Sequence, residues 1–469
     1  MIKKRKHIHF MGIGGSGMSA AALIAHCQGY MVSGCDLVES TPYLNKVKKQ
    51  KIPVFVGHDS KHLESVDILA VTPAAFFQSN KHPEFVTGKK LKELMTWQEF
   101  LGKYLHKNKE VVCIAGTHGK STTTAMTALL FEKANKDPSV VIGATIKKWE
   151  TNYRFGKSEI FITEADEFFD NFLNYRPDII ILNNIELDHP DFFKSEKHVF
   201  QSFEKFVHKL IGAKTLIVNC DSPGVKKLFK MLGDSFLNSI NIVGYSISSK
   251  PLISTPVSVG GKIIKRNKDS TVFQVVSKDL KLNHEFSLCV PGDYNVANAL
   301  GVIILGKLHG IDTALIKKSL SSYSGIGRRL ELVGTKDNIK VYDDYAHHPT
   351  AVSVTIKALR QQFPKQRIWV IVEPHSYSRT KVLLKKYKHA FDYADRVIIG
   401  PIFKARDSKT FGVTGQSIVD VAEHEKIRFL DNLGKIVKLI KKSARRGDVI
   451  VVMGAGASYR WARDIFENL

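Results

Sequence analysis

A glycine-rich segment at residues 116–122 (GTHGKST) carries the residue types that bind the phosphates of a nucleotide. It lies between an apolar run at 111–115, which predicts a buried strand, and a stretch of helical character at 122–133. Glycines let backbone amides wrap phosphate oxygens, Lys120 neutralises charge, and the Ser121 hydroxyl is suited to magnesium. The common GxxxxGKS/T pattern has its first glycine where this chain has Ile114, so the loop is a variant. The residues predicted to bind ATP here are Gly116, Thr117, His118, Gly119, Lys120, Ser121 and Thr122.

Acidic side chains and a histidine follow two further apolar runs, where those strands are expected to end. Glu164, with Asp166 and Glu167 just beyond it, follows one run, and Asp188-His189 lies a short way past the other. Because the carboxyl ends of parallel strands share one edge of a sheet, both groups are expected beside the phosphate loop. Such side chains suit Mg²⁺ or Mn²⁺, so a metal site is predicted at Ser121, Glu164 and His189. Asp166 alone is equally well explained as a turn former or helix cap.

A second glycine pattern, GxGxxG, stands near the start of the chain at Gly12, Gly14 and Gly17. It follows the β-rich run 7–12, and Asp36 comes 19 residues after its last glycine. Backbone amides and a helix amino terminus facing a pyrophosphate, with a carboxylate near a ribose, are typical of dinucleotide sites. Any nucleoside diphosphate can use the same loop, and a purely structural turn remains an alternative.

Two polar segments in the last third of the chain, 342–350 (YDDYAHHPT) and 373–381 (EPHSYSRTK), each follow an expected strand. Arg379 is a candidate for bidentate binding of a substrate carboxylate. Arg328 and Arg329 precede this region and can reach phosphate, or they form salt bridges with neighbours. His347 and His348 are adjacent in sequence and should point apart, which argues against a zinc site between them.

Composition limits the classes of protein to consider. The chain has 469 residues, 43% of them hydrophobic and 24% charged, which is typical of a folded protein. No apolar stretch is long enough to span a bilayer and no signal peptide is evident, so a cytoplasmic protein without membrane insertion is expected. The formal charge of +24 is spread over the whole chain, which favours a solvated surface over nucleic-acid binding. The five cysteines lack a CxxC pair, so buried thiols are expected rather than disulfides or a zinc site.

The strand signals separate into three segments, which predict three domains at 1–107, 108–324 and 325–469. The expected fold class is α/β, with Rossmann-like first and last domains around a P-loop ATPase domain whose sheet is mainly parallel. Short, polar-alternating strands between 242 and 290 indicate antiparallel hairpins within the central domain.

Eight ordered motifs resemble those of the Mur ligases over essentially the full chain. They are HIHFMGIGGSGMSAAA from His7, GTHGKSTTT from Gly116, EADE from Glu164, NNIELDH from Asn183, GDYNVANAL from Gly292, GRRLELVG from Gly327, DDYAHHPT from Asp343 and PHSYSRT from Pro374. The resemblance is strongest to members that join L-alanine to UDP-N-acetylmuramate. It implies an ATP-dependent ligase of cytoplasmic peptidoglycan precursor synthesis, active as a monomer or weak dimer, in which a carboxylate attacks the γ-phosphate and an amine displaces the acyl phosphate.

The resemblance also implies roles for individual residues. In the first domain the UDP sugar would be bound by Gly12, Gly14, Gly15, Ser16, Gly17, Asp36 and Thr72. Asn295 would face the adenine, Arg328 the phosphates and Asp344 the ribose. Tyr345, His375 and Arg379 would border the amino acid. The residues implied to be catalytic are Lys120, His189, His348 and Arg379.

Three other functions are compatible with parts of the sequence. A related ligase that attaches a whole tripeptide to the same sugar nucleotide is the alternative within the family. A nicotinamide-dependent dehydrogenase would explain GxGxxG but leaves GTHGKSTTT without a role. A nucleic-acid-binding P-loop ATPase would explain the charge and the loop but not the last segment.

Overall fold

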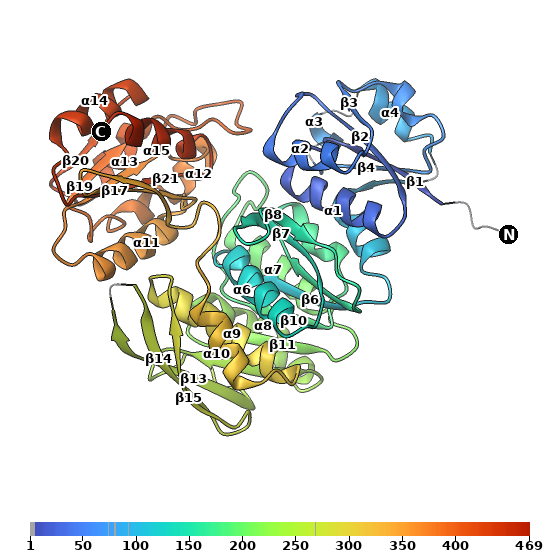
Figure 1. The fold of residues 1–469 in the computed structure, drawn as a ribbon, viewed down its shortest axis with the longest axis horizontal. Coiled ribbons are helices and arrows are strands. Elements are labelled where there is room, and N and C mark those ends of the chain that lie inside the picture. Colours follow the sequence, from blue (N-terminus) through green and yellow to red (C-terminus); the bar gives the residue numbers. More distant parts are fainter. Residues whose placement is uncertain (1–4, 74, 79–80, 92, 268) are drawn as a thin grey trace.

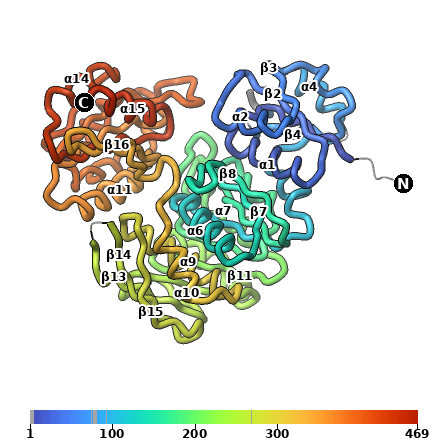
Figure 2. The backbone as a smooth tube through the Cα atoms, viewed as in Figure 1, coloured from blue at the N-terminus to red at the C-terminus, as the bar shows by residue number. Residues whose placement is uncertain are grey.

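The computed structural model describes residues 5–73, 75–78, 81–91, 93–267 and 269–469. Three sheets follow one another along the chain, each with its own helices (Figure 1). The backbone trace shows the first and last parts lying above the central part, with the carboxyl-terminal end far from the amino-terminal end (Figure 2). The expected α/β class with three sheet-based parts is therefore confirmed. Within the described residues, no helix combines the length and apolar character needed to cross a membrane.

The first sheet is parallel throughout its described strands, in the order β3-β2-β1-β4-β5. Its strand β4 is fully buried and apolar, as expected for a parallel sheet covered on both faces. Its elements are β1 (His7–Met11), α1 (Ser16–Cys27), β2 (Met31–Asp36), α2 (Pro42–Lys49), β3 (Val54–Val56), the 3₁₀ turn η1 (Ser60–Leu63), β4 (Ile68–Val71), α3 (Ala75–Gln78), α4 (Pro83–Gly88), β5 (Glu93–Thr96), α5 (Trp97–Phe100) and the π-helical turn η2 (Leu101–Leu105).

The central sheet has the described order β15-β14-β13-β12-β11-β10-β6-β9-β7-β8. Its strands run parallel from β13 to β7, and the pairs β13-β14, β14-β15 and β7-β8 are antiparallel. The elements are β6 (Glu110–Ala115), α6 (Lys120–Lys133), β7 (Ser139–Ile146), β8 (Thr151–Arg154), β9 (Ile160–Glu164), η3 (Phe168–Asn174), β10 (Ile179–Leu182), α7 (Glu196–Val207), β11 (Thr215–Asn219), α8 (Pro223–Leu237), β12 (Asn241–Ser246), β13 (Val257–Arg266), β14 (Thr271–Ser277), β15 (Leu282–Leu288), α9 (Asp293–Leu308) and α10 (Thr313–Ser321).

Alternate residues of β6 pack into two different cores, so helices cover both faces of the central sheet. Val112 and Ile114 pack with residues of α6, α9 and α10, whereas Val111 and Cys113 pack with those of α7 and α8. The phosphate loop lies where β6 gives way to α6, at the carboxyl end of a strand. A parallel sheet of this kind places ligands at that edge.

The last sheet, in the order β16-β17-β21-β18-β19-β20 along its described strands, is parallel apart from β16. It comprises β16 (Glu331–Lys336), β17 (Ile339–Asp344), α11 (Pro349–Gln362), β18 (Ile368–Val372), α12 (Tyr377–Leu383), η4 (Leu384–Tyr387), β19 (Arg396–Ile399), α13 (Gly415–Val421), β20 (Ile427–Phe429), α14 (Leu433–Ser443), β21 (Val449–Met453) and α15 (Ser458–Glu467).

Two sequence expectations need correction. The region 242–290 does contain the expected hairpins, but β12 pairs in parallel with β11 and joins them to the central sheet, so they extend that sheet. The cysteines were all expected to be buried, yet Cys27 and Cys289 are exposed because each follows the last buried position of its element.

Candidate active site

The phosphate loop is shaped by glycines and held by the segment that follows β10. Gly116 and Gly119 have φ angles of 129° and 83°, a region that residues with a Cβ rarely adopt. The Asn184 side chain accepts the His118 amide at 2.8 Å, and its backbone carbonyl accepts the Thr117 amide at 3.1 Å. The loop is therefore fixed with its backbone bent around the amino terminus of α6, where a phosphate would be stabilised.

Lys120 lies inside this loop and is held by a carboxylate. Its Nζ donates to the Gly116 carbonyl and to Glu167 Oε2, both at 2.7 Å. Burial lowers the pKa of Lys120, but the nearby charges of Glu167, Asp166 and Glu164 outweigh burial and raise it. The lysine is thus a fixed positive charge at the predicted phosphate position.

Three ligand-type side chains, Asp166, Glu167 and His189, gather beside Lys120 with donor atoms within 4.8 Å of one another. Burial raises the pKa of Glu167 to about 7, with a further contribution from the charge of Asp166, and burial also raises the pKa of Asp166. Glu167 Oε1 is buried and has no hydrogen-bond partner. This crowding of carboxyl oxygens around an unpartnered atom fits a divalent cation such as Mg²⁺.

The predicted metal ligands divide into two groups. Ser121 Oγ donates to Glu164 Oε1 at 3.0 Å, and the Gly143 amide donates to Glu164 Oε2 at 2.8 Å. His189 groups with Asp166 and Glu167 instead. The sequence analysis named Asp166 and Glu167 as neighbours of Glu164 but did not place them at the metal site, because position after a strand does not tell which way a side chain points.

Arg379 connects the last sheet to the central one. Its Nε donates to Asp188 Oδ1 at 2.6 Å, its Nη1 lies 2.8 Å from His375 Nδ1, and its Nη2 lies 3.3 Å from His189 Nδ1. The guanidinium is buried, and the negative charge of Asp188 raises its pKa although burial lowers it. Arg379 was expected to be free for a substrate carboxylate, and one of its nitrogens is instead committed to Asp188.

Glu186 is a site residue that the sequence analysis did not single out. Its Oε2 accepts from Thr350 Oγ1 at 2.8 Å and lies 3.8 Å from His118 Nε2 and from His348 Nδ1. His118 belongs to the phosphate loop and His348 begins α11, so the carboxylate bridges two domains. The NNIELDH motif contained this residue, but only the fold could show its partners.

The two adjacent histidines point apart, as expected. His348 lies against His118, with ring centroids 4.9 Å apart, whereas His347 lies 5.6 Å from His375 and 3.9 Å from Asp188. Burial lowers the pKa of His348 to about 4 and that of His375 to about 4, so both rings are neutral near pH 7. Tyr345 stands beside His347, with ring centroids 5.4 Å apart.

The remaining predicted nucleotide contacts are occupied by bonds within the protein. Arg328 donates to Asp343, to the Gly454 carbonyl and to Ser458. Asp344 accepts the backbone amides of Leu330 and Ala346, and burial raises its pKa. Asn295 Nδ2 donates to the Pro291 carbonyl at 2.6 Å. These side chains shape the junction between α9 and the last sheet.

The amino-terminal glycine loop is a tight turn tied to β2. The Gly12 amide donates to the Cys35 carbonyl at 2.8 Å, and the Gly14 amide donates to Asp36 Oδ2 at 2.9 Å. Ser16 contacts the β7-β8 hairpin, because Asn152 Nδ2 donates to its carbonyl at 2.6 Å and to its Oγ at 3.1 Å. Gly12 lies next to Thr72, and Gly15 and Gly17 complete the turn into α1. The loop therefore faces the central domain.

Comparison with known proteins agrees with this architecture. Three family models match in order: "Mur ligase family, catalytic domain" at residues 7–107, "Mur ligase middle domain" at 114–306, and "Mur ligase, glutamate ligase domain" at 328–456. A relative from Acetivibrio thermocellus named UDP-N-acetylmuramate--L-alanine ligase is 36% identical over 467 residues, covering 97% of this chain and 95% of the relative.

Solved structures show the same fold. A crystal structure of UDP-N-acetylmuramate-alanine ligase from Thermotoga maritima has a TM-score of 0.77 and 27% identity, and the match covers 98% of both chains. A murein peptide ligase from Psychrobacter arcticus has a TM-score of 0.68 at 24% identity, covering 99% of this chain and 98% of that one, which is a likeness of fold alone. With ordered family models along its length and a relative that shares more than a third of its residues, the chain belongs to the Mur ligase family.

Proposed function

We propose that this chain uses ATP to join L-alanine to the lactyl carboxylate of UDP-N-acetylmuramate. The observation that carries the proposal is the position of His189. Its ring groups with Asp166 and Glu167 beside the phosphate loop, and its Nδ1 lies 3.3 Å from Arg379 of the last domain. The predicted phosphate-binding region and Arg379, the arginine proposed to bind the amino-acid carboxylate, thus both lie next to His189, which supports an ATP-dependent carboxylate ligase.

The reaction proceeds in two displacements. The substrate carboxylate attacks the γ-phosphorus of ATP, the bond to the β-phosphate oxygen breaks, and ADP leaves. The amine of L-alanine then attacks the acyl phosphate carbon, phosphate leaves, and an amide forms with loss of one proton. Phosphoryl transfer depends mainly on positioning and neutralisation of charge, so no protein nucleophile is required.

Side chains and backbone amides of this chain would position the substrates and the metal ion. The amides of residues 116–122 and Lys120 would hold the ATP phosphates, with Arg328 beside them, Asn295 at the adenine and Asp344 at the ribose. Mg²⁺ would be held by Ser121, Glu164 and His189, with Asp166 and Glu167 close by, and would neutralise phosphate charge. Arg379, His375 and Tyr345 would orient L-alanine, and His348, which is neutral near pH 7, would complete this side of the site.

The domains would divide the work in sequence order. Residues 1–107 would bind the UDP sugar through the loop 12–17, Asp36 and Thr72. Residues 108–324 would bind ATP, and residues 325–469 would receive the amino acid. ATP and a sugar nucleotide as substrates are consistent with a cytoplasmic enzyme, for which we expect a monomer or weak dimer.

Phosphate release from ATP tests the proposal. With magnesium and UDP-N-acetylmuramate present, L-alanine should stimulate release more than glycine, serine or the tripeptide, each assayed alone. Stimulation by the tripeptide only would assign the chain to the recycling reaction instead. No stimulation by any of the four would refute a ligase of this substrate.

A further inference from the structure

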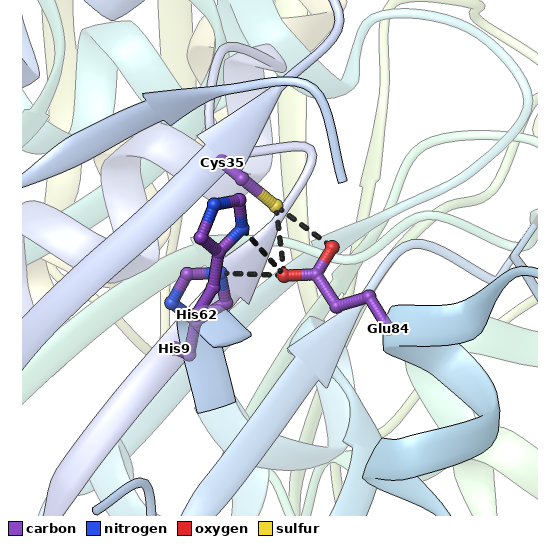
Figure 3. A group of neighbouring side chains, drawn as sticks. All are labelled: His9, Cys35, His62 and Glu84. Carbon is purple, nitrogen blue, oxygen red and sulfur yellow. Dashed lines mark hydrogen bonds and ion pairs between the residues drawn. The ribbon is translucent and has the colours of Figure 1, made fainter. Parts of the chain in front are cut away.

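Four metal-binding side chains converge in the amino-terminal domain, away from the phosphate loop. His9 comes from β1, Cys35 from β2, His62 from η1 and Glu84 from α4. Figure 3 shows the two rings, the thiol and the carboxylate pointing toward one another. Their ligand atoms all lie within 4.8 Å of each other. His9, Cys35 and Glu84 are fully buried, so water does not compete for these atoms.

The distances within the cluster are those of donors sharing one ion. Glu84 Oε1 lies 3.0 Å from His9 Nε2 and 3.3 Å from His62 Nδ1. Cys35 Sγ lies 3.3 Å and 3.1 Å from the two Glu84 oxygens. Ligand atoms at the corners of a zinc tetrahedron are separated by roughly 3.3–3.7 Å, given Zn–N and Zn–O bonds near 2.0 Å and Zn–S near 2.3 Å. A small outward shift would admit the metal.

The hydrogen-bond pattern leaves a bare lone pair on His9 Nε2. His7 Nδ1 lies 3.2 Å from the Ser65 carbonyl, which only accepts, so this nitrogen carries the proton of neutral His7. His7 Nε2 therefore accepts from the Ser33 hydroxyl at 2.8 Å. The same hydroxyl oxygen, 2.8 Å from His9 Nδ1, must then accept from His9.

With its proton on Nδ1, His9 directs an unprotonated Nε2 at the Glu84 carboxylate. This nitrogen is buried and has no hydrogen bond. Nε2 of His9 and Oε1 of Glu84, 3.0 Å apart, are placed to share one cation.

We propose that His9, Cys35, His62 and Glu84 bind a structural zinc ion. Binding would release the Cys35 thiol proton to solvent, and the thiolate, two imidazole nitrogens and a carboxylate oxygen would complete a closed tetrahedron. A thiolate and imidazoles select zinc over magnesium, which prefers oxygen ligands. Ser33 would act as the orienting partner of His9.

Access is available from one side. The side chains of His58 and His62 are 10% and 13% exposed, and His58 Nδ1 lies 2.9 Å from Cys35 Sγ. The ring of Phe55 stacks on the ring of His62, with centroids 4.4 Å apart, and covers that ring. Consecutive ligands are more than twenty residues apart in the sequence, so no short motif predicts the site. The spacing of the cysteines had argued against zinc.

The site would brace the turn expected to hold the UDP sugar. The Cys35 carbonyl accepts the amides of Gly12 at 2.8 Å and Ile13 at 3.0 Å. A metal bound to the Cys35 side chain would fix that carbonyl, and with it the start of the glycine loop. Zinc would therefore act on structure and not on the chemical step.

Metal analysis of the full-length protein tests the proposal. Protein equilibrated with zinc in excess magnesium and then dialysed should retain stoichiometric zinc by mass spectrometry. Cys35→Ser and His62→Gln should each lose most of it. The matched control is Cys220→Ser, which removes another buried thiol in the central domain and should retain zinc.

Cobalt provides a second measurement that identifies the thiolate. Cobalt-loaded wild type and Cys220→Ser should show a sulfur-to-cobalt charge-transfer band, which Cys35→Ser should lack. His62→Gln should change the band while leaving the sulfur ligand, and it keeps the test valid where Cys35→Ser does not fold. Wild type that retains no more zinc than Cys35→Ser, or shows no such band, overturns the proposal.

Discussion

At the scale of single residues, the site holds its charges in internal pairs. Lys120 Nζ lies 2.7 Å from Glu167 Oε2, and Arg379 Nε lies 2.6 Å from Asp188 Oδ1. Arg379 is buried and Lys120 is half-buried, and both are held by these pairs before any ligand arrives. Charges fixed in this way do not have to reorganise when phosphate charge develops, which is the main source of electrostatic catalysis.

Replacing Lys120 should separate catalysis from sugar-nucleotide binding. Lys120→Ala is expected to lower kcat by about 10²–10³, the usual loss for one preorganised charge at a transition state. Calorimetric titration should show unchanged affinity for UDP-N-acetylmuramate, because the two nucleotides are assigned to different domains. Lys148→Ala is the control, since Lys148 is 62% exposed and pairs with Glu132. Loss of both bindings together would show the domain assignment to be wrong.

The contribution of Arg379 to activity should depend on the shape of its guanidinium and not only on its charge. Arg379→Lys keeps a cation but cannot reach Asp188, His375 and His189 at once. A charge-assisted hydrogen bond contributes about 1.5–3 kcal/mol, so alanine-dependent phosphate release should fall roughly 10- to 100-fold. Arg360→Lys is a matched control on the same domain, where Arg360 pairs with Asp395. Equal activity of the two variants would contradict a binding role for Arg379.

At the scale of elements, the buried parallel strands were predictable and the edges were not. The run 111–115 was expected as a buried strand and lies within β6, because continuous apolar residues in a covered sheet leave a clear signal. β8 (TNYR) and β16 (ELVGTK) have no such run and are defined by pairing with neighbours.

The candidate site was predictable in part for the same reason. Residues that follow a strand end, such as Glu164 and His189, could be placed at the ligand edge of a sheet. Their partners could not, because Glu167 and Glu186 contact side chains at the starts of helices that lie elsewhere in the chain. Chain position gives the edge, whereas the direction of each side chain depends on tertiary packing.

The glycines of the phosphate loop are required by shape. A Cβ at Gly119 would lie 2.7 Å from Asn298 Oδ1 and 2.9 Å from Asn183 Nδ2, at a φ of 83°. Gly119→Ala should therefore distort the loop at a cost of about 1–3 kcal/mol and raise the KM for ATP roughly tenfold or more. Gly260→Ala in β13 is the control, because its nearest neighbour would be 3.9 Å away. An unchanged KM for ATP in Gly119→Ala would argue against phosphate binding at this loop.

At the scale of the whole molecule, polar contacts join the three domains at the site. Asn152 joins the first domain to the central one through Ser16, and Asp188 and Glu186 join the central domain to the last. The hydrogen bonds of such contacts contribute about 0.5–1.5 kcal/mol each. These contacts help to set the position of the last domain, whose two hydrophobic cores are separate from those of the other domains.

Removing the Asn152 side chain should affect the sugar nucleotide selectively. Asn152→Ala deletes both hydrogen bonds to Ser16, which lies in the loop assigned to the UDP sugar. The KM for UDP-N-acetylmuramate should rise about 2- to 10-fold, as expected for one or two hydrogen bonds. The KM for ATP should stay the same. Asn468→Ala, at the exposed carboxyl end, is the control; a change in both KM values would indicate general loosening of the fold.

The segment of seven residues after β10 contacts both the phosphate loop and the last domain. Asn183 and Asn184 hold the phosphate loop, Glu186 holds Thr350, and Asp188 holds Arg379. Each partner contacts a residue that lies a fixed number of positions after the end of β10. Insertion or deletion of one residue would misalign every later contact at once, whereas a single substitution disturbs one. Evolution should therefore conserve the length of this segment more strictly than the identity of its residues.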